Sequence, residues 1–354
     1  MNKTKKVSRA DIARLAGVSG AAVTYALSDK ESSKLKKETR DKILKIAEDL
    51  GYQPAFSGKS LSTGKSYTIG LLLPEQRMLN YLHYMSIVSG IAEGCEKTDY
   101  NLTLFFRNSI DKCMTSMRNG RIDGIIVLQS DFDSATIAGI TNAGLPSVIV
   151  DYDYDLANAP ANIACVRADH EKLIHDAFKF FISKKCKSIM HICAKQDRCA
   201  SASSIMTNAF TIECQKHASS GIFGITLNPT LNFSLQIRNM LESGQRWDAF
   251  LVDSECLAEL LIEELSKASL KTEKDCQTIV SSTGLRRYVC NKYRGELQFK
   301  NYYVQQQNEI GKSAWDVLSD MLAGKETEHK RLIPYKYWQA DKEPPPCYWN
   351  SAEK

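Results

Sequence analysis

The sequence contains no long apolar run. None of its 354 residues belongs to a stretch approaching the roughly 18–20 apolar residues that a membrane-spanning helix needs. The N-terminal residues MNKTKKVSRADIARLAG are charged and lack the apolar centre of a secretory signal. Hydrophobic residues make up 43% and charged residues 25%, which excludes a disordered chain, a collagen and a coiled-coil rod. We therefore expect a globular protein of about two or three domains that stays in the cytoplasm.

The eleven cysteines show no pattern of a disulfide framework or a zinc finger. Their number is odd, no C-x-x-C pair occurs, and no Cys/His cluster has zinc-finger spacing. We expect reduced thiols that pack as small hydrophobic groups. The alternative is a redox-sensing thiol, for which Cys199 beside Arg198 is the candidate, because a nearby cation lowers a thiol pKa.

Motifs of enzymes are also missing. We find no G-x-G-x-x-G, P-loop, G-x-S-x-G or H-E-x-x-H sequence. The six histidines are isolated, and His191 lies in an apolar run that favours a hydrogen-bonded strand residue over a catalytic base. The sequence predicts no catalysis, no cofactor and no metal site.

Charge is distributed unevenly along the chain. Residues 1–65 hold fourteen Lys or Arg against seven Asp or Glu, a net charge of +7, whereas the remainder carries −2. A basic head on a slightly acidic body indicates that the head binds a polyanion. On charge alone, a merely solvated basic face is the alternative.

Residues 8–51 have the pattern of three short helices. Ser8 is a candidate N-cap with Asp11 in the capping-box position, Gly17 supplies a turn, and Ser19 is a second N-cap. The residues expected to face inward are Ile12, Leu15 and Ala16 in the first helix (9–16), and Val23 and Leu27 in the second (20–27). The third helix starts near Thr39, with Ile43, Ile46, Ala47 and Leu50 at helical spacing. Two short helices around a glycine turn, closed by a third, form a helix-turn-helix unit whose second helix enters the major groove.

From Tyr67 onward, short apolar runs alternate with helical segments. The runs cover 68–74, 101–106, 123–129, 146–152 and 188–193, and then 221–227, 249–253 and 277–282. Near-continuous apolar runs suit parallel strands buried on both faces. The helical stretches between them are 85–97, 109–119, 134–143, 169–183, 203–217, 234–243 and 256–268. We expect an α/β body with two successive parallel sheets, which binds a ligand between two lobes at the carboxyl ends of the strands.

These residues resemble a known family. DIARLAGVSGAAVTYALS (11–28) is similar to the head of lactose-repressor/galactose-repressor family regulators, and TRDKILKIAEDLGYQP (39–54) resembles their third helix and its G-Y-x-P end. RIDGIIV (121–127), GLPSVIVD (144–151) and YVQQQNEIGKSAWDVL (303–318) match the body of the same regulators. The resemblance implies an N-terminal helix-turn-helix DNA-binding domain plus an α/β, periplasmic-binding-protein-like, two-lobed core with parallel sheets. The expected boundaries are a head at 1–54, a hinge at 55–66, a core at 67–338 and an irregular tail at 339–354.

The resemblance also implies DNA-binding roles for single residues of the head. Gly20, Ala21 and Tyr25 occupy base-reading positions. Because Gly20 and Ala21 have no polar side chain, more of the specificity is left to DNA shape. Positions that contact phosphates are Ser8, Ser19, Thr24, Ser28 and Arg40. For Tyr25 the alternative is a surface aromatic packed on the third helix.

The segment after Pro54 resembles the family's hinge, which folds into a helix on operator DNA. Lys59 matches its basic position, and Leu61 matches the leucine that is pushed into the minor groove and kinks the duplex. Gly58 stands where the family usually has Ala, which costs a helix roughly 1 kcal/mol. A flexible Ser/Gly linker is the alternative.

The effector pocket departs from the family pattern. Sugar-binding members carry an R-x-x-G-F element, an N-D pair and a G-F-D-D element. In this sequence the three elements begin at Met206, Ser254 and Ser281. Met206 therefore stands in place of the Arg of the first element, and Thr283 stands in place of an Asp of the third. A sugar cannot then be held by the usual donors and acceptors. Candidate effector-binding residues, each with packing as the alternative, are Tyr81, Tyr84, Arg167, Asp169, Met206, Ser254 and Thr283.

Three functions are compatible with these observations. The first is a transcriptional regulator, expected to be a repressor, that binds a near-palindromic operator on double-stranded DNA as a homodimer and responds to a small metabolite. The second is a DNA-binding regulator that has lost its small effector or is controlled by a protein partner. The third is a solute-binding protein, against which the attached head and the missing signal peptide both argue.

Overall fold

The computed structural model describes residues 7–27, 34–52, 60, 63–128, 134–151, 160–193, 202–228, 232–282 and 299–339. The chain divides into two compact units, Met1–Ser66 and Tyr67–Lys354. Each unit has its own hydrophobic core, so each is considered by itself.

The first unit is a bundle of three helices. They are α1 (Arg9–Ala16), α2 (Gly20–Ala26) and α3 (Lys37–Asp49). Ile12, Val23 and Ile43 contribute one fully buried side chain from each helix, because their spacing places them on the inner faces. The prediction that Leu15 faces inward is wrong: its side chain is 51% exposed. Ala16, the next residue and the last of α1, is buried in the core as predicted.

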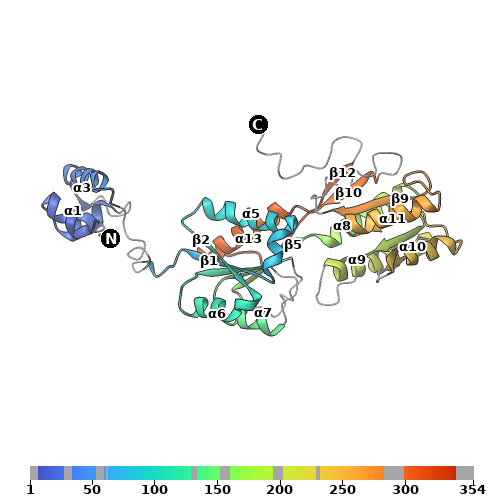
Figure 1. The fold of residues 1–354 in the computed structure, drawn as a ribbon, viewed down its shortest axis with the longest axis horizontal. Coiled ribbons are helices and arrows are strands. Elements are labelled where there is room, and N and C mark those ends of the chain that lie inside the picture. Colours follow the sequence, from blue (N-terminus) through green and yellow to red (C-terminus); the bar gives the residue numbers. More distant parts are fainter. Residues whose placement is uncertain are drawn as a thin grey trace. The chain divides into compact units, whose positions relative to one another are not determined.

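The second unit contains two six-stranded sheets that form two lobes (Figure 1). The first sheet has the order β11-β5-β4-β3-β1-β2, and all its paired strands are parallel. Its strands are β1 (Thr68–Leu73), β2 (Asn101–Phe106), β3 (Gly124–Leu128), β4 (Ser147–Val150), β5 (Ile163–Ala168) and β11 (Lys330–Ile333).

Helices cover both faces of this first sheet. Side chains of α5 (Leu82–Glu96) and α13 (Gln307–Leu322) pack on one face. Those of α6 (Ile110–Arg118) and α7 (Ser134–Thr141) pack on the other. Two short 3₁₀ helices, η2 (Gln76–Asn80) and η3 (Arg107–Ser109), precede α5 and α6.

The second lobe repeats this three-layer plan. Its sheet order is β12-β10-β9-β8-β6-β7, and among the described strand pairs β10–β12 alone is antiparallel. The strands are β6 (Ser188–Ile192), β7 (Phe223–Leu227), β8 (Ala249–Val252), β9 (Gln277–Ser282), β10 (Asn301–Val304) and β12 (Lys336–Gln339). Helices α8 (His170–Ser183) and α9 (Ala202–His217) cover one face, and α10 (Phe233–Glu242) and α11 (Glu255–Lys267) cover the other. A further 3₁₀ helix, η4 (Ala218–Ser220), follows α9.

The α/β, two-lobed fold class is confirmed, but two expectations about the sheets are wrong. The sheets are not simply successive, because the chain returns to the first lobe with α13 and β11 before it ends in β12 of the second. Strands β2 and β7 are not buried on both faces, since they lie at sheet edges and expose Leu104 by 41% and Ile225 by 47%. Within the described part of the chain, no helix is long and apolar enough to cross a bilayer.

Candidate functional site

The start of α2 in the first unit is capped and exposed. Gly17 adopts a left-handed conformation with φ of 71°, which a glycine tolerates without strain, and turns the chain between α1 and α2. The Ser19 hydroxyl then accepts a hydrogen bond from the Ala22 amide at 3.2 Å, which confirms the predicted N-cap. Gly20 and Ala21 follow on the exposed surface. The N-terminus of α2 thus carries small, exposed residues.

The start of α1 has the predicted capping box. The Asp11 amide donates to the Ser8 hydroxyl at 3.3 Å, and the Ser8 amide donates to the Asp11 carboxylate at 3.0 Å. Both residues are therefore used to fix the helix. Ser8 is exposed, and its hydroxyl also donates to the Asp11 carboxylate at 2.6 Å.

The remaining predicted DNA contacts of this unit lie on α2 and α3. Thr24 is exposed, donates to the Gly20 carbonyl at 3.1 Å and accepts from Arg9 at 3.3 Å. The half-buried Tyr25 ring has the Lys34 ammonium 4.9 Å from its centroid. Arg40 is half-buried on α3, and its Nε makes no hydrogen bond to the described residues. The structure thus leaves Thr24 and the Lys34 charge on the outside of the bundle.

Several predicted positions lie outside the described residues: Ser28, Lys59, Leu61, Thr283 and Cys199. Beside the hinge positions, the Gly64 amide donates to the Ser60 carbonyl at 2.9 Å.

Two of the predicted effector residues, Asp169 and Ser254, follow strands of the second unit, and two more, Tyr81 and Tyr84, lie at the start of α5. Tyr81, 49% exposed, precedes α5, and its ring centroid lies 6.4 Å from that of Tyr84. Asp169 follows β5 and caps α8 by accepting from the Lys172 amide at 3.0 Å. Ser254 follows β8 and caps α11 in the same way. These caps explain the residue types without requiring a ligand, so their effector role stays a prediction.

Arg167 and Met206 are placed in the interior. Arg167 lies on β5, and its fully buried guanidinium forms a bidentate pair with Glu171 at 2.7 and 2.9 Å. This pairing lowers the pKa of the Glu171 carboxyl against the opposing effect of burial. Met206 is 4% exposed and packs against Phe210 and the second-lobe core. Both side chains are thus buried among protein neighbours, which agrees with the packing alternative given for each of them.

The structure adds polar residues that the sequence prediction missed. Asp151 follows β4 with a φ of 60°, and Oδ1 of its carboxylate is buried without a hydrogen-bond partner among the described residues. Burial raises the pKa of this carboxyl to about 6, against the opposing charge of Arg167. The Tyr335 hydroxyl lies 2.9 Å from His170 Nδ1, and burial raises its pKa, as do the charges of Asp151 and Asp253. The sequence did contain a signal for Asp151 and Asp253, because each directly follows an apolar run, in VIVD and FLVD.

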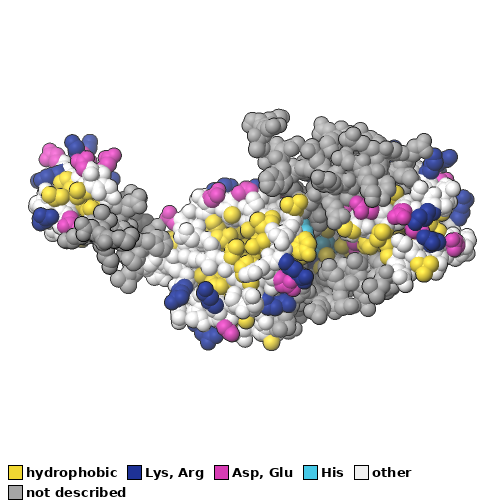
Figure 2. Space-filling model, viewed as in Figure 1, with side chains coloured by type: hydrophobic (Ala, Val, Ile, Leu, Met, Phe, Trp, Pro, Cys, Tyr) yellow, Lys and Arg dark blue, Asp and Glu magenta, His cyan; other side chains and the backbone are white. Residues whose placement is uncertain are grey.

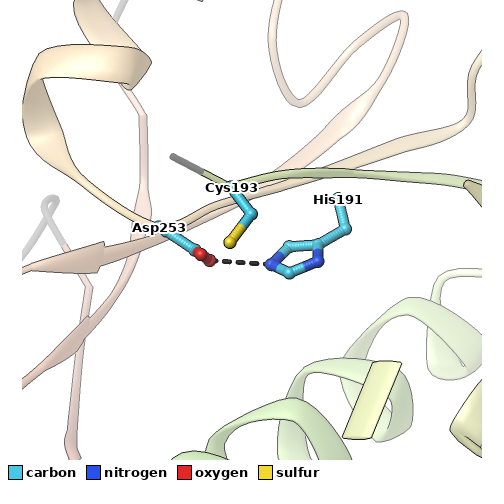
Figure 3. A group of neighbouring side chains, drawn as sticks. All are labelled: His191, Cys193 and Asp253. Carbon is cyan, nitrogen blue, oxygen red and sulfur yellow. Dashed lines mark hydrogen bonds and ion pairs between the residues drawn. The ribbon is translucent and has the colours of Figure 1, made fainter. Parts of the chain in front are cut away.

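His191, Cys193 and Asp253 lie together in the second lobe (Figure 3). His191 Nε2 is 2.8 Å from Asp253 Oδ1, and the His191 ring is fully buried. This confirms His191 as a hydrogen-bonded strand residue. Cys193 directly follows β6, and its thiol lies beside His191 and Asp253. From the spacing of these residues in the sequence, no metal site was predicted. The cysteines among the described residues, eight in all, are free thiols.

An apolar surface lies over the helices of the first lobe. Figure 2 shows hydrophobic side chains gathered over α5 and α13. Leu82 and Met85 of α5 are 46% and 38% exposed. Exposed apolar patches of this kind mark sites of protein association.

Comparisons with known proteins match both units. The family model described as "Bacterial regulatory proteins, lacI family" matches residues 6–55, and that of "Periplasmic binding proteins and sugar binding domain of LacI family" matches residues 66–341. The chain is 33% identical to the probable transcriptional repressor ExuR of Bacillus subtilis over 49% of this chain and 50% of that protein. It is 25% identical to the regulator GalR of Streptococcus thermophilus over 88% of this chain and 92% of that protein. The chain spans about half the length of the first curated relatives it matches.

A similar solved structure is the lac repressor dimer bound to operator and an anti-inducer. Its TM-score is 0.67 at 17% identity, covering 94% of this chain and 98% of that one, which establishes the likeness of fold. A helix-turn-helix unit joined to a two-lobed, periplasmic-binding-like core defines the class of DNA-binding regulators with a ligand-binding body. Within that class, the chain belongs to the lacI family of bacterial regulatory proteins. The expectation that it is not an enzyme agrees with its relatives, which are transcriptional repressors and regulators.

Proposed function

We propose that the chain is a sequence-specific transcriptional repressor that binds a near-palindromic operator as a homodimer. The observation that carries the proposal is the exposed, Ser19-capped start of α2 directly after the Gly17 turn. In helix-turn-helix proteins the N-terminal residues of this second helix contact base edges in the major groove. The small Gly20 and Ala21 allow a close approach there, and the +7 charge of residues 1–65 attracts the phosphates.

The homodimer is supported by the exposed apolar surface of α5 (Figure 2). Two copies related by a two-fold axis present two identical heads. A dimer therefore reads two half-sites of opposite orientation, which makes the operator near-palindromic.

A small metabolite bound between the lobes is supported by buried polar atoms at the strand ends. Asp151 Oδ1 and Gln307 Oε1 lack hydrogen-bond donors among the described residues, although each is buried. Buried acceptors in native proteins are nearly always satisfied, and hydroxyl groups of a sugar or a related metabolite would supply the donors. The sugar-binding description of the matched family model points to the same class of ligand.

A regulator without a small effector is the second candidate. Specific observations favour it: Arg167 is already paired with Glu171, and Met206 occupies the place of a ligand-binding Arg. A thermal-shift screen of the full chain against sugars, sugar phosphates, nucleosides and amino acids separates the two candidates. A ligand in hundredfold excess over its dissociation constant stabilises the protein by about 2.7 kcal/mol. A raised Tm supports the metabolite, and a screen without any shift favours control by a protein partner or constitutive binding.

Selection of genomic DNA fragments by the purified full chain, followed by gel-shift titration, tests the DNA-binding proposal. We expect a symmetric site to be enriched, with binding that Ala21→Glu abolishes by placing a carboxylate against the groove. The matched control is Ile212→Glu, which makes the same charge change at a side chain 51% exposed on α9. Equal binding of specific and random DNA, or an equal loss in both variants, would contradict the proposal.

A further inference from the structure

The carboxyl ends of β6 and β8 hold three side chains of metal-ligating type. Strands β6 and β8 pair in parallel, with Ile192 beside Val252, so the next residues, Cys193 and Asp253, leave the sheet side by side. His191 lies one strand repeat before Cys193 and points to the same side. The imidazole nitrogen, the thiol sulfur and the carboxylate oxygen all lie within 4.8 Å of one another (Figure 3).

The carboxylate of Asp253 is only half satisfied. Its side chain is 6% exposed, and Oδ1 faces His191 Nε2 at 2.8 Å. The second oxygen, Oδ2, is buried and has no hydrogen-bond partner of good geometry among the described residues, although the Cys193 thiol interacts with the same carboxylate. An ordinary buried His–Asp pair explains the first oxygen and leaves the second without a full partner, which carries a desolvation cost. A cation bound at this end of the carboxylate removes that cost.

The surrounding residues suit a metal-bound histidine. His191 Nδ1 lies 3.3 Å from the Thr226 hydroxyl, which can donate to the nitrogen or accept from it. When Nε2–H donates to Asp253, Thr226 donates to Nδ1. When Nε2 binds a metal, the proton resides on Nδ1 and Thr226 accepts it. Hydrogen bonds of this type to the second nitrogen orient metal-bound histidines.

The sulfur of Cys193 is also held in place. It accepts from the Thr207 hydroxyl at 3.7 Å and donates to the Ser203 carbonyl at 3.6 Å, both on α9. A thiol binds a metal as its thiolate, so a metal bound here displaces the proton of the Cys193 thiol.

We propose that His191, Cys193 and Asp253 bind one divalent transition-metal ion of the Zn²⁺ class. Binding replaces the thiol proton by a sulfur–metal bond and releases that proton to solvent, while Nε2 and a carboxylate oxygen supply two further bonds. Tetrahedral zinc bonds of about 2.0–2.3 Å place neighbouring ligand atoms roughly 3.4 Å apart. The His191–Asp253 separation, now 2.8 Å, opens by about 0.6 Å to admit the ion. The fourth position is left for water or a ligand of the cleft.

The donor set selects the metal. One sulfur, one imidazole nitrogen and one carboxylate oxygen suit Zn²⁺ or Co²⁺, whereas Mg²⁺ and Ca²⁺ require oxygen ligands. The ion would join β6 to β8 beside Ser254, one of the predicted effector residues. An influence of the metal on operator binding rests on the proposed function, but metal binding itself does not.

Co²⁺ titration of the reduced full chain, followed by absorption spectroscopy, tests the site without DNA. We expect one Co²⁺ per chain, with a sulfur-to-cobalt charge-transfer band and the intense visible bands of four-coordinate cobalt. Cys193→Ser should abolish the charge-transfer band, and Asp253→Asn should weaken Co²⁺ binding at least about tenfold. The control is Cys256→Ser, which removes an exposed thiol on α11 and should leave the spectrum unchanged.

The possible outcomes separate clearly. A charge-transfer band that survives in Cys193→Ser, or that disappears in Cys256→Ser, overturns the proposal, as does the absence of four-coordinate bands in the unaltered protein. If Cys193→Ser does not fold, unchanged Co²⁺ affinity in Asp253→Asn overturns it instead. Because these spectra need no operator, failure of DNA binding would not be mistaken for failure of the metal site.

Discussion

Gly311 of α13 lies directly against Ile87 of α5: a Cβ atom at position 311 would stand 2.0 Å from the Ile87 carbonyl oxygen. The contact is reciprocal, since a Cβ at Gly90 of α5 would stand 2.1 Å from the Asn308 carbonyl oxygen. The two helices therefore touch through their backbones, and this close approach fixes the α5–α13 layer over the first sheet.

Gly311→Ala should destabilise the second unit by about 1–3 kcal/mol or more, because backbone atoms must move apart to admit the methyl group. The control is Gly139→Ala on α7, where the nearest atom, Met114 Cε, would be 3.7 Å away and no strain arises. Urea unfolding followed by tryptophan fluorescence measures the effect, since none of the four tryptophans lies in residues 1–66. Equal midpoints for both variants would refute the close contact.

Ser8→Ala should destabilise the first unit alone, by about 1 kcal/mol, because the Asp11 amide loses its cap. Hydrogen exchange measured by mass spectrometry should show the amides of α1 exchanging roughly fivefold faster, while peptides of the second unit are unchanged. Ser8→Thr keeps the hydroxyl and serves as control. Unchanged exchange in α1 of Ser8→Ala would show that the capping box adds nothing there.

Local sequence patterns predicted most of the helices and their caps, because those features depend on near neighbours in the chain. Ser8, Ser19 and the Gly17 turn are examples. The patterns failed where the structure depends on distant segments. Strand β5 was missed because Arg167 interrupts its apolar run, and the charge of this buried residue is compensated by Glu171 and by the Ala168 carbonyl. The return of β11 to pair with β5 cannot be read from either segment alone.

The candidate sites show the same limit. The recognition-helix positions follow from a contiguous motif and could be named residue by residue. The cluster of His191, Cys193 and Asp253 joins segments about 60 residues apart through the β6–β8 pairing, so no spacing in the sequence revealed it. Asp151 and Asp253 each follow an apolar run, but the burial of their carboxylate oxygens became visible only with the other strands in place.

The stability of the second unit should fall as the pH rises from about 4 to above 6, through the titration of Asp151. Burial raises the pKa of its carboxyl to about 6 in the folded state, whereas the unfolded chain titrates near about 3.9. The folded state therefore holds the proton more tightly, and the stability it contributes is present at low pH and lost as pH rises. By pH 7 the loss is about 2–3 kcal/mol.

Asp151→Asn should remove this loss. As the pH rises from 4 to 7, the free energy of unfolding of the variant should increase by about 2–3 kcal/mol relative to that of the unaltered protein. Urea titrations at several pH values measure the difference, with the exposed Asp316→Asn on α13 as control. Parallel stability curves for Asp151→Asn and the unaltered chain would contradict a raised pKa.

Leu61→Ala should weaken binding to the selected operator by about 10–100-fold and leave binding to random DNA nearly unchanged. An apolar wedge acts only where it enters the minor groove and unstacks a base step. Gel-shift titrations on both DNAs measure the ratio, and Leu235→Ala, at a side chain 48% exposed on α10, is the matched control. Similar losses on operator and random DNA would remove the wedge from the mechanism.

Lys59→Gln should reduce both the affinity for DNA and its dependence on salt. Each phosphate that a cation neutralises releases condensed counterions, so the slope of log affinity against log salt concentration should become shallower by roughly 0.9. Because the contact is to the backbone, the loss should be similar on operator and random DNA, in contrast to Leu61→Ala. Lys97→Gln removes an exposed charge from the second unit and should leave the slope unchanged. An unaltered slope in Lys59→Gln would mean that this cation does not contact a phosphate, and the hinge would then act through its leucine alone.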